Sequence, residues 1–322
     1  MSTILITGGA GFIGSHLTKK LLEKNYQVIV VDNLITGSEK NIKEFKNNKN
    51  FTFIKANVIK PLDNLLGNFS KINFIFHLAS PASPNHKSPI SYHQLALETM
   101  LVNTVGTLAL LKLAKKNQAK FLFASTSEVY GNPLVHPQDE NYFGNVNPVG
   151  PRSVYDESKR FGETLTSYFI NKKGVDGRIA RIFNTYGPNM RIDDKRMVVN
   201  FIIQALKNKK ITIYGDGSQT RSLCYVDDLV DGLIKLMFNK NTNGQIINLG
   251  NPKEHKVLEY AKIIKRLTRS KSKIVFEEEL PIDDPIKRKP EIKKAKKLLN
   301  WEPKTDLIKG LKKTINYFKK II

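Results

Sequence analysis

The segment Tyr155-Asp156-Glu157-Ser158-Lys159 places a tyrosine and a lysine four positions apart, so that both side chains share one face of a helix. A phenol has a pKa of about 10, and it needs a nearby positive charge to act as a base at neutral pH. The Lys159 ammonium would supply that charge. Thr126 follows a predicted strand, and its hydroxyl could bond the same substrate oxygen. These residue types predict a site where a tyrosine takes a proton from a hydroxyl group.

A second chemical signal lies at the N-terminus, where a predicted strand over 3–7 runs directly into a glycine-rich turn and then a helix. The spaced glycines are Gly8, Gly11 and Gly14. They allow a tight turn and close approach of the backbone to a pyrophosphate, which the helix N-terminus then binds. Asp32 ends the next predicted strand, where it could accept both ribose hydroxyls and would repel a 2′-phosphate. Asn33, and no arginine, follows it, so the pattern favours NAD over NADP.

Short apolar runs alternate with helical patterns through the first half of the chain. The predicted strands cover 3–7, 27–32, 51–56, 72–79, 119–125 and 177–183. The predicted helices include a long one over 97–116 and one near 152–172. Continuously apolar strands that alternate with helices indicate an α/β fold with a doubly wound parallel sheet, the Rossmann type.

The pattern loosens from about residue 184, where turn-rich stretches such as YGDGSQ (214–219) appear. We therefore expect an NAD-binding Rossmann domain over 1–184. A later segment, at about 220–250, is expected to return to this domain and form part of it. The remainder, mainly 185–322, would form a smaller C-terminal substrate-binding lobe.

Composition limits the class of protein. The chain has 322 residues, of which 40% are apolar, and a mean hydropathy of −0.32. One cysteine, Cys224, excludes an internal disulfide framework and a cysteine-cluster metal site. The histidines show no metal-ligand spacing, and His77 is interpreted as strand packing. No apolar run approaches the roughly 18 residues that span a bilayer, and the N-terminus lacks a signal-peptide pattern. We expect a cytoplasmic protein with no membrane partner and no metal.

The net charge of +23 would suit a nucleic-acid binder. The charge is denser towards the C-terminus, but acids such as Glu277–Glu279 are mixed into it. No block of one sign is long enough to be a basic tail. A lysine-rich solvated surface is the favoured interpretation, and no nucleic-acid partner is expected.

The glycine loop, strand-end threonine and Tyr-Lys pair occur in the order of the extended short-chain dehydrogenase/reductase superfamily. Further motifs cover nearly the whole chain: STSEVYG (125–131), HPQ (136–138), GNVNP (144–148), ARIFNTYGP (180–188), YGDGSQTRS (214–222), YVDDLVDG (225–232), NLGNP (248–252) and WEP (301–303). They resemble the UDP-glucuronate decarboxylase family, also called UDP-xylose synthases. The resemblance implies tightly held NAD, oxidation of C4 of UDP-glucuronate, loss of CO2 and re-reduction to UDP-xylose.

The resemblance also implies roles for individual residues. Tyr155 would remove the O4 proton, while Lys159 tunes it and binds the nicotinamide ribose. Thr126 would hydrogen-bond O4, and Glu128 would face the C5 side. Ser127 stands where related 4,6-dehydratases carry an aspartic acid. The absence of that acid fits decarboxylation, and Ser127 could instead bond the uronate.

Two larger sets follow from the resemblance. The substrate set consists of Asn184, Gln219, Arg221, Tyr225 and Arg288. The cofactor set consists of Gly8, Gly11, Phe12, Ile13, Gly14, Asp32, Asn33, Asn57, Val58, Leu78, Ala79, Ser80, Tyr155, Lys159, Thr185, Arg191 and Arg196. Arg288 is in addition a candidate for protonating C5 or holding the carboxylate. The loop with Arg191 and Arg196 is expected to close over the nicotinamide side. A homodimer is implied, through the long helices that include the one carrying Tyr155.

The chain departs from the family pattern at two places. Asn57 replaces a usual aspartate near the adenine site, although an amide can still accept a proton from the adenine amino group. The segment 83–101 is longer than the common pattern, and Leu101 stands where a lysine is often found. That segment borders the expected sugar pocket.

Two alternatives remain open at this level. A UDP-sugar 4-epimerase, acting on UDP-glucuronate or UDP-glucose, would use the same tyrosine, lysine and NAD. In that enzyme the 4-keto sugar would rotate in the site before it is reduced again. Evolution of CO2 separates the two enzymes. A non-catalytic NAD-binding module with an RNA partner would use the basic surface, but the intact tyrosine, lysine and threonine count against it.

Overall fold

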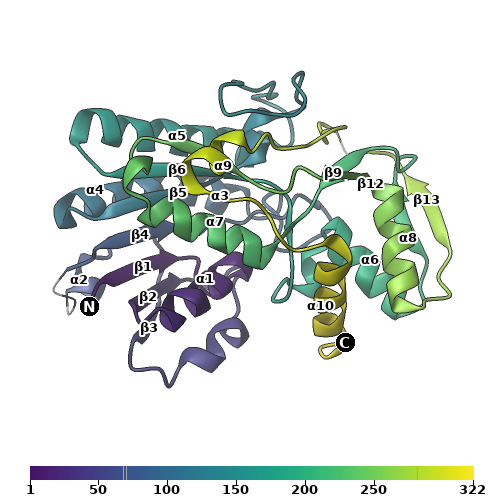
Figure 1. The fold of residues 1–322 in the computed structure, drawn as a ribbon, viewed down its shortest axis with the longest axis horizontal. Coiled ribbons are helices and arrows are strands. Elements are labelled where there is room, and N and C mark those ends of the chain that lie inside the picture. The colour runs from purple at the N-terminus through teal and green to yellow at the C-terminus, as the bar shows by residue number, and fades with distance from the viewer. Residues whose placement is uncertain (68, 70, 281) are drawn as a thin grey trace.

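A seven-stranded parallel sheet forms the larger half of the computed structural model, which describes residues 1–67, 69, 71–280 and 282–322 (Figure 1). Its strands are β1 (Thr3–Thr7), β2 (Gln27–Asp32), β3 (Phe51–Lys55), β4 (Phe74–His77), β5 (Lys120–Thr126), β6 (Gly177–Ile182) and β11 (Ile246–Leu249). The strand order is β11-β6-β5-β4-β1-β2-β3. The chain thus winds outward from β1 in one direction and from β4 in the other. This confirms the doubly wound fold, whose switch point between β1 and β4 is where such sheets bind ligands.

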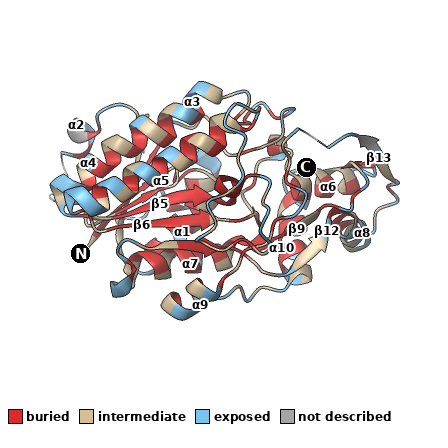
Figure 2. Ribbon diagram, turned by 90° about the horizontal axis from the view of Figure 1, so that it is seen from above, coloured by how far each residue is buried: buried red, intermediate tan, exposed pale blue. Residues whose placement is uncertain are grey.

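Alternating residues of the central strands face opposite sides of the sheet, and both sides are covered. Ile4 and Ile6 pack in the core that includes α1 (Phe12–Glu23) and α7 (Val226–Phe238). Leu5 lies in the other core, which includes residues of the helices over 107–117 and 153–173. The sheet is accordingly buried, while the helices show exposed outer faces (Figure 2). Burial on both faces explains why these strands are apolar without alternation.

One face is covered by α5 (Ser153–Lys173) and by a helical run over 96–117 that contains a π-helical turn. The run consists of α3 (Ala96–Leu101), the π turn Val102–Gly106 and α4 (Thr107–Asn117). Within the π turn, Asn103 donates hydrogen bonds to Ser80 Oγ and Ser158 Oγ, each at 3.1 Å. The single predicted helix over 97–116 is therefore interrupted where its polar side chain links the cavity wall to α5.

The same helical run corrects the expectation that no segment is long and apolar enough to span a bilayer. Ala96–Asn117 is long and apolar enough, by length and composition, to cross a membrane. In the fold it packs against α5 and against the strands β4 and β5. Asn103, Thr107, Leu110 and Ala114 are buried in these contacts.

The smaller half lies beside the large sheet, on the right in Figure 1, and contains short sheets and helices. Its helices are α6 (Met197–Leu206), α8 (Val257–Thr268) and α10 (Leu307–Lys319). Its paired strands are β8 (Ile211–Tyr214) with β13 (Ile274–Glu278), β9 (Thr220–Ser222) with β12 (Glu254–Lys256), and β7 (Thr185–Tyr186) with β10 (Cys224–Tyr225). Between these segments α7 packs on β6, and β11 pairs with β6. The remaining helices are α2 (Asp63–Leu66) and α9 (Lys293–Leu299).

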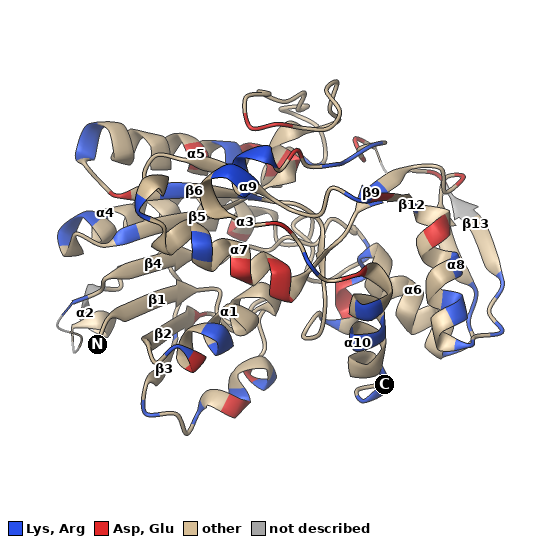
Figure 3. Cartoon of the chain, viewed as in Figure 1, with Lys and Arg blue, Asp and Glu red and all other residues tan. Residues whose placement is uncertain are grey.

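Lysine and arginine side chains are spread over several helices, with acidic side chains among them (Figure 3). Blue positions appear on α4, α5, α8, α9 and α10, which lie on different sides of the molecule. This distribution matches a generally lysine-rich surface.

Candidate active site

A cavity of about 620 Å³ opens at the carboxyl ends of the central strands and reaches into the smaller half. All seventeen residues expected to contact NAD line it. Thr126, Ser127 and Glu128 line it too, as do four of the five expected substrate residues: Asn184, Gln219, Arg221 and Arg288. The fold thus brings together residues that are up to 280 positions apart in the sequence.

Tyr225 is the exception and requires a correction. It is not among the described residues that line the cavity. Its ring is buried, packs edge-on against Tyr186 with 5.6 Å between the ring centroids, and lies 5.2 Å from Lys313 Nζ. The tyrosine ends β10 and immediately precedes α7, so its side chain fills the junction of the two halves.

The glycine loop fits a dinucleotide because side chains there would collide with the backbone. A Cβ on Gly8 would lie 2.7 Å from the Ala79 nitrogen, and one on Gly14 would lie 2.2 Å from the Gly8 carbonyl oxygen. Gly8 also has a φ of +75°, which glycine adopts without strain. The backbone of β1, the loop and α1 can therefore approach a pyrophosphate closely.

Asp32 lies at the end of β2, and its carboxylate lines the cavity. It accepts hydrogen bonds from the backbone nitrogens of Ala10 at 3.0 Å and Leu34 at 2.8 Å. Burial raises the pKa of Asp32, and these two hydrogen bonds oppose the rise. The carboxylate is thus fixed where a ribose of a dinucleotide bound at the glycine loop would lie.

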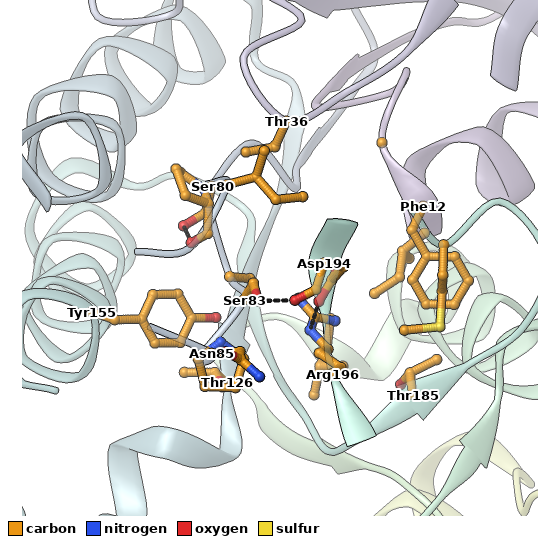
Figure 4. Close-up of a pocket in the computed structure, with 18 of the residues that line it drawn as sticks. Phe12, Thr36, Ser80, Ser83, Asn85, Thr126, Tyr155, Thr185, Asp194 and Arg196 are labelled. Carbon is orange, nitrogen blue, oxygen red and sulfur yellow. Dashed lines mark hydrogen bonds and ion pairs between the residues drawn. The ribbon is translucent and has the colours of Figure 1, made fainter. Parts of the chain in front are cut away.

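The predicted base and its partners meet at one point of the cavity. Tyr155, on the first turn of α5, and Thr126, at the end of β5, both line the cavity, and the Thr126 side chain lowers the pKa of Tyr155. The Thr126 oxygen accepts from the Glu128 nitrogen at 3.2 Å, which caps a short 3-10 helix over 127–130. In Figure 4 the Tyr155 hydroxyl points into the cavity on the side where Thr126 lies. A substrate hydroxyl placed there could contact both oxygens.

The pKa of Tyr155 differs from the sequence expectation. Burial raises it above its ordinary value, while the Thr126 side chain and the charge of Arg196 oppose the rise. Lys159 donates to the Ala124 carbonyl at 2.8 Å, and its Nζ lies 5.8 Å from the centroid of the Tyr155 ring. Burial lowers the pKa of Lys159 to about 7. The chain alone therefore keeps Tyr155 a neutral phenol, because desolvation outweighs the nearby charges.

Next to this pair, the carboxylate of Glu128 is held by two arginines. Arg152 donates to it at 2.6 Å, and Arg288 donates with both terminal nitrogens, one of them at 2.8 Å. Burial alone would raise the pKa of Glu128, but the charges of Arg152 and Arg288 outweigh it and lower the pKa to about 2. Glu128 is therefore ionised, and it does not act as a proton donor in this arrangement.

The charge cluster extends through Asp284, which pairs with Arg221 at 2.6 Å and with Arg152 at 3.2 Å. Asp156, next to the base, is buried, and its Oδ1 has no hydrogen-bond partner among the described residues. Burial raises the pKa of Asp156 to about 8, and the neighbouring charge of Glu128 adds to the rise. One carboxyl of this pair stays protonated, and it is Asp156, because the arginines hold Glu128 charged.

The loop with Arg191 and Arg196 is tied to the divergent segment 83–88 across the cavity (Figure 4). Ser83 Oγ donates to the Asp194 carbonyl at 2.7 Å, Ser88 Oγ to that of Asp193 at 2.6 Å, and Asn85 Nδ2 to that of Lys195 at 2.9 Å. Asp194 in turn contacts Arg196 at 3.1 Å. The segment therefore fixes the loop that brings Arg196 towards the base.

Two amides on the wall of the smaller half retain unused acceptors. Asn184 Oδ1 and Gln219 Oε1 are buried without a hydrogen-bond partner among the described residues, and both residues line the cavity. An unpaired buried acceptor is costly, so these oxygens favour a ligand that donates hydrogen bonds to them. Thr185 in contrast donates to the Phe183 carbonyl at 2.9 Å.

The sequence interpretation missed Arg152, Asp284 and Tyr92. Arg152 lies three residues before Tyr155, and helical spacing places both on one face, so this residue could have been found. Asp284 comes four residues before Arg288, but nothing in the sequence indicates which arginine it contacts. Tyr92 lies in the segment that departs from the family pattern, and its contact with Tyr155 depends on the tertiary fold.

Known proteins with similar sequences share one family. The sequence model of the NAD dependent epimerase/dehydratase family matches residues 4–250. The chain is 50% identical over 317 residues to UDP-glucuronic acid decarboxylase 1 of Xenopus tropicalis, covering 98% of this chain and 72% of that protein. It is 51% identical over 315 residues to UDP-glucuronic acid decarboxylase 1 of Danio rerio, with the same two coverages.

Solved structures with the same fold include two epimerases. The UDP-glucose 4-epimerase of Thermotoga maritima, solved with UDP-glucose, has a TM-score of 0.88 and 30% identity, covering 99% of both chains. The UDP-glucuronic acid 4-epimerase of Bacillus cereus, solved with UDP-glucuronic acid and NAD, has a TM-score of 0.87 and 29% identity, covering 99% of this chain and 100% of that chain.

Proposed function

The chain belongs to the NAD dependent epimerase/dehydratase family, and from this premise we propose that it converts UDP-glucuronate to UDP-xylose and CO2. Two relatives whose sequences are 50% and 51% identical to it are UDP-glucuronic acid decarboxylases. One observation in the site supports the decarboxylase. The Tyr155–Thr126 hydroxyl pair lies beside a carboxylate bound by Arg152 and Arg288, with a serine and no acid at position 127. Such a site can oxidise a sugar hydroxyl next to arginines whose remaining N–H groups can bind a uronate.

NAD, which the glycine loop and Asp32 would hold, would supply the acceptor for the C4 hydride and the donor for the later reduction. Tyr155 accepts the O4 proton as its phenolate, because it lies with Thr126 at the cavity wall and a bound cationic nicotinamide ring would lower its pKa. The carboxylate on C5 is then β to a ketone. When the C5–C6 bond breaks, CO2 leaves, and the electron pair moves to O4 as an enolate, which both hydroxyls stabilise. C5 then gains a proton from solvent, while the proton on Tyr155 returns to O4 in the re-reduction. No hydroxyl has to be expelled, so an acid at position 127 is unnecessary.

The residues around the diphosphate and uridine are expected to be Arg221, Arg288, Asn184 and Gln219. The arginines suit phosphate oxygens, which they can bind with two donors each. The free acceptors of Asn184 and Gln219 suit donors of a uracil ring or ribose. Asp32 and the glycine loop hold the other nucleotide, and Asp32 favours NAD over NADP.

The enzyme is also proposed to be a homodimer through α3, the π turn and α5. These elements contact each other and expose large apolar side chains, among them Leu97 and Phe161. Large apolar side chains exposed on packed helices support a protein interface.

The deciding experiment is incubation of the purified protein with UDP-glucuronate labelled at the carboxyl carbon. Release of labelled CO2 together with a UDP-pentose is expected. The Tyr155→Phe variant is the control for contaminating activity. UDP-galacturonate without CO2 would instead identify the 4-epimerase, which the structural similarity to the Bacillus cereus enzyme keeps as the second candidate.

A further inference from the structure

The ring of Tyr92 lies flat against the ring of Tyr155. The two ring centroids are 4.9 Å apart, and the ring planes differ by 4°. Tyr92 is 1% exposed and comes from the connection between β4 and α3, which is the segment that departs from the family pattern. Its contact with Tyr155 is therefore made from behind the cavity wall, since Tyr92 is not among the described lining residues.

Tyr92 also contacts the charge cluster. The Arg152 guanidinium carbon lies 5.9 Å from the centroid of the Tyr92 ring, within the range of a cation–π interaction. Arg152 itself donates to Glu128 at 2.6 Å. The hydroxyl of Tyr92 has no hydrogen-bond partner among the described residues. In this structure Tyr92 thus acts through its ring, which contacts both Tyr155 and Arg152.

The backbone around Tyr92 is fixed at both ends of a short loop. The Tyr92 nitrogen donates to the Ser83 carbonyl at 3.1 Å, and Ser83 Oγ donates to the Asp194 carbonyl at 2.7 Å. Ser88 makes the same kind of bond to Asp193 at 2.6 Å. The ring of Tyr92 is therefore held by a segment that is itself bonded across the cavity.

We infer that Tyr92 is a positioning residue for the base Tyr155, an inference that rests on the proposed function. The phenol oxygen of Tyr155 is set by two side-chain torsions, and a parallel ring in contact with one face restricts both. Proton removal requires the donor and acceptor oxygens to lie within hydrogen-bond reach, and a misplacement of about 1 Å can cost about 10²-fold in rate. Tyr92 supplies that restriction from outside the substrate-contacting shell.

The test compares variants that keep or remove the ring. Tyr92→Phe keeps it, whereas Tyr92→Leu and the longer Tyr92→Met remove it. Phe169→Leu is the control, because Phe169 is a buried aromatic residue on the same helix, in the core away from the cavity. The measurements are kcat and KM for UDP-glucuronate, the melting temperature, and the kinetic isotope effect with substrate deuterated at C4.

We expect Tyr92→Leu and Tyr92→Met to lower kcat by about 10- to 100-fold with KM changed less than about threefold. The isotope effect should rise, because oxidation at C4 becomes slower than the other steps. Tyr92→Phe should stay within about twofold of wild type, and Phe169→Leu should lower the melting temperature without changing the isotope effect.

The inference is overturned if the two ring-deleted variants keep wild-type kcat and isotope effect, or if Phe169→Leu reproduces their kinetics. If Tyr92→Leu does not fold, Tyr92→Met decides, since methionine fills most of the space of the ring. Wild-type protein that releases no CO2 would refute the proposed function instead, and the two failures are thereby distinguished.

Discussion

At the scale of single residues, the site combines a base that the chain keeps protonated with a carboxylate that the chain keeps ionised. Burial raises the pKa of Tyr155, and two arginines lower that of Glu128 to about 2. The two groups lie close together, yet their protonation states are opposite at neutral pH. The arrangement assigns proton transfer to Tyr155 and leaves Glu128 to hold Arg152 and Arg288 in place.

The first prediction concerns the base itself. Tyr155→Phe removes only the hydroxyl and should leave the fold and NAD binding intact. Since general acid–base groups contribute about 10²–10⁴-fold, turnover of UDP-glucuronate should fall by at least that order. The measurement is labelled CO2 release by protein purified with its NAD. Near-normal turnover would show that another group removes the O4 proton.

The second prediction concerns Ser127, which lines the cavity between Thr126 and Glu128. Two unit charges about 4 Å apart repel by roughly 4 kcal/mol at an effective dielectric constant near 20. Ser127→Asp should therefore weaken processing of UDP-glucuronate strongly while NAD binding stays nearly unchanged. Ser127→Ala should be milder, because it removes only a hydroxyl. Equal kinetics of the Asp variant and wild type would mean that the carboxylate of the substrate lies elsewhere.

Much of this residue set could be predicted because its members follow recognisable motifs. Tyr155, Lys159 and Asp32 line the cavity, as their spacing and neighbours indicate. Tyr225 does not, because a motif position does not reveal that a ring turns inward against Tyr186. The pKa of Tyr155 could not be predicted either, since it depends on burial and on where Lys159 places its ammonium.

At the scale of elements, α5 carries an unusual number of site groups in its first two turns. Arg152 immediately precedes the helix, Tyr155 and Lys159 line the cavity, and Asp156 is buried beside them. The strands around it could be predicted closely, because continuous apolar runs are unambiguous when they lie between helices. The π turn over 102–106 could not, since its sequence is compatible with an ordinary helix.

The third prediction uses Asp156, whose pKa rises from 3.8 to about 8, first because of burial and then because of Glu128. Between about pH 4 and about pH 8, the pKa values of Asp156 in the unfolded and folded states, the folded protein retains a proton that the unfolded chain has lost. The free energy of unfolding therefore falls as pH rises through this window. Asp156→Asn stays neutral at every pH and should be free of this loss.

Near pH 4, the melting temperatures of Asp156→Asn and wild type should be close together. Near pH 8, the melting temperature of the variant should be higher by several degrees, since 1 kcal/mol corresponds to roughly 2–4 °C for a large domain. Asp231→Asn is the control, because that carboxyl is 54% exposed on α7. A difference between Asp156→Asn and wild type that does not change with pH would mean that Asp156 is ionised in the fold.

At the scale of the whole molecule, a doubly wound half provides the nucleotide end of the cavity and a smaller half provides the other end. The large sheet could be predicted from alternating strands and helices. The short paired strands of the smaller half could not, because segments of two to five residues carry too little periodicity to distinguish them from turns.

The fourth prediction concerns assembly. Leu97 and Phe161 are 61% and 50% exposed on helices that contact each other, so the protein should have twice the mass of the 36.5 kDa chain by light scattering. Replacing both residues by aspartate should give a monomer. Phe276→Asp is the control, since Phe276 is 53% exposed on β13 in the smaller half. A wild-type monomer would refute the proposed interface.

The double pairing of Asp284 has a consequence for selectivity. Its carboxylate competes with any anion that enters the cavity, because it already forms ion pairs with Arg221 and Arg152. A free phosphate or chloride ion would have to displace it with a single weak contact. A nucleoside diphosphate that is anchored elsewhere in the cavity arrives with a high effective concentration and can displace it. If Arg221 binds the diphosphate as proposed, we expect free phosphate and chloride to bind the cavity far more weakly than a nucleoside diphosphate does.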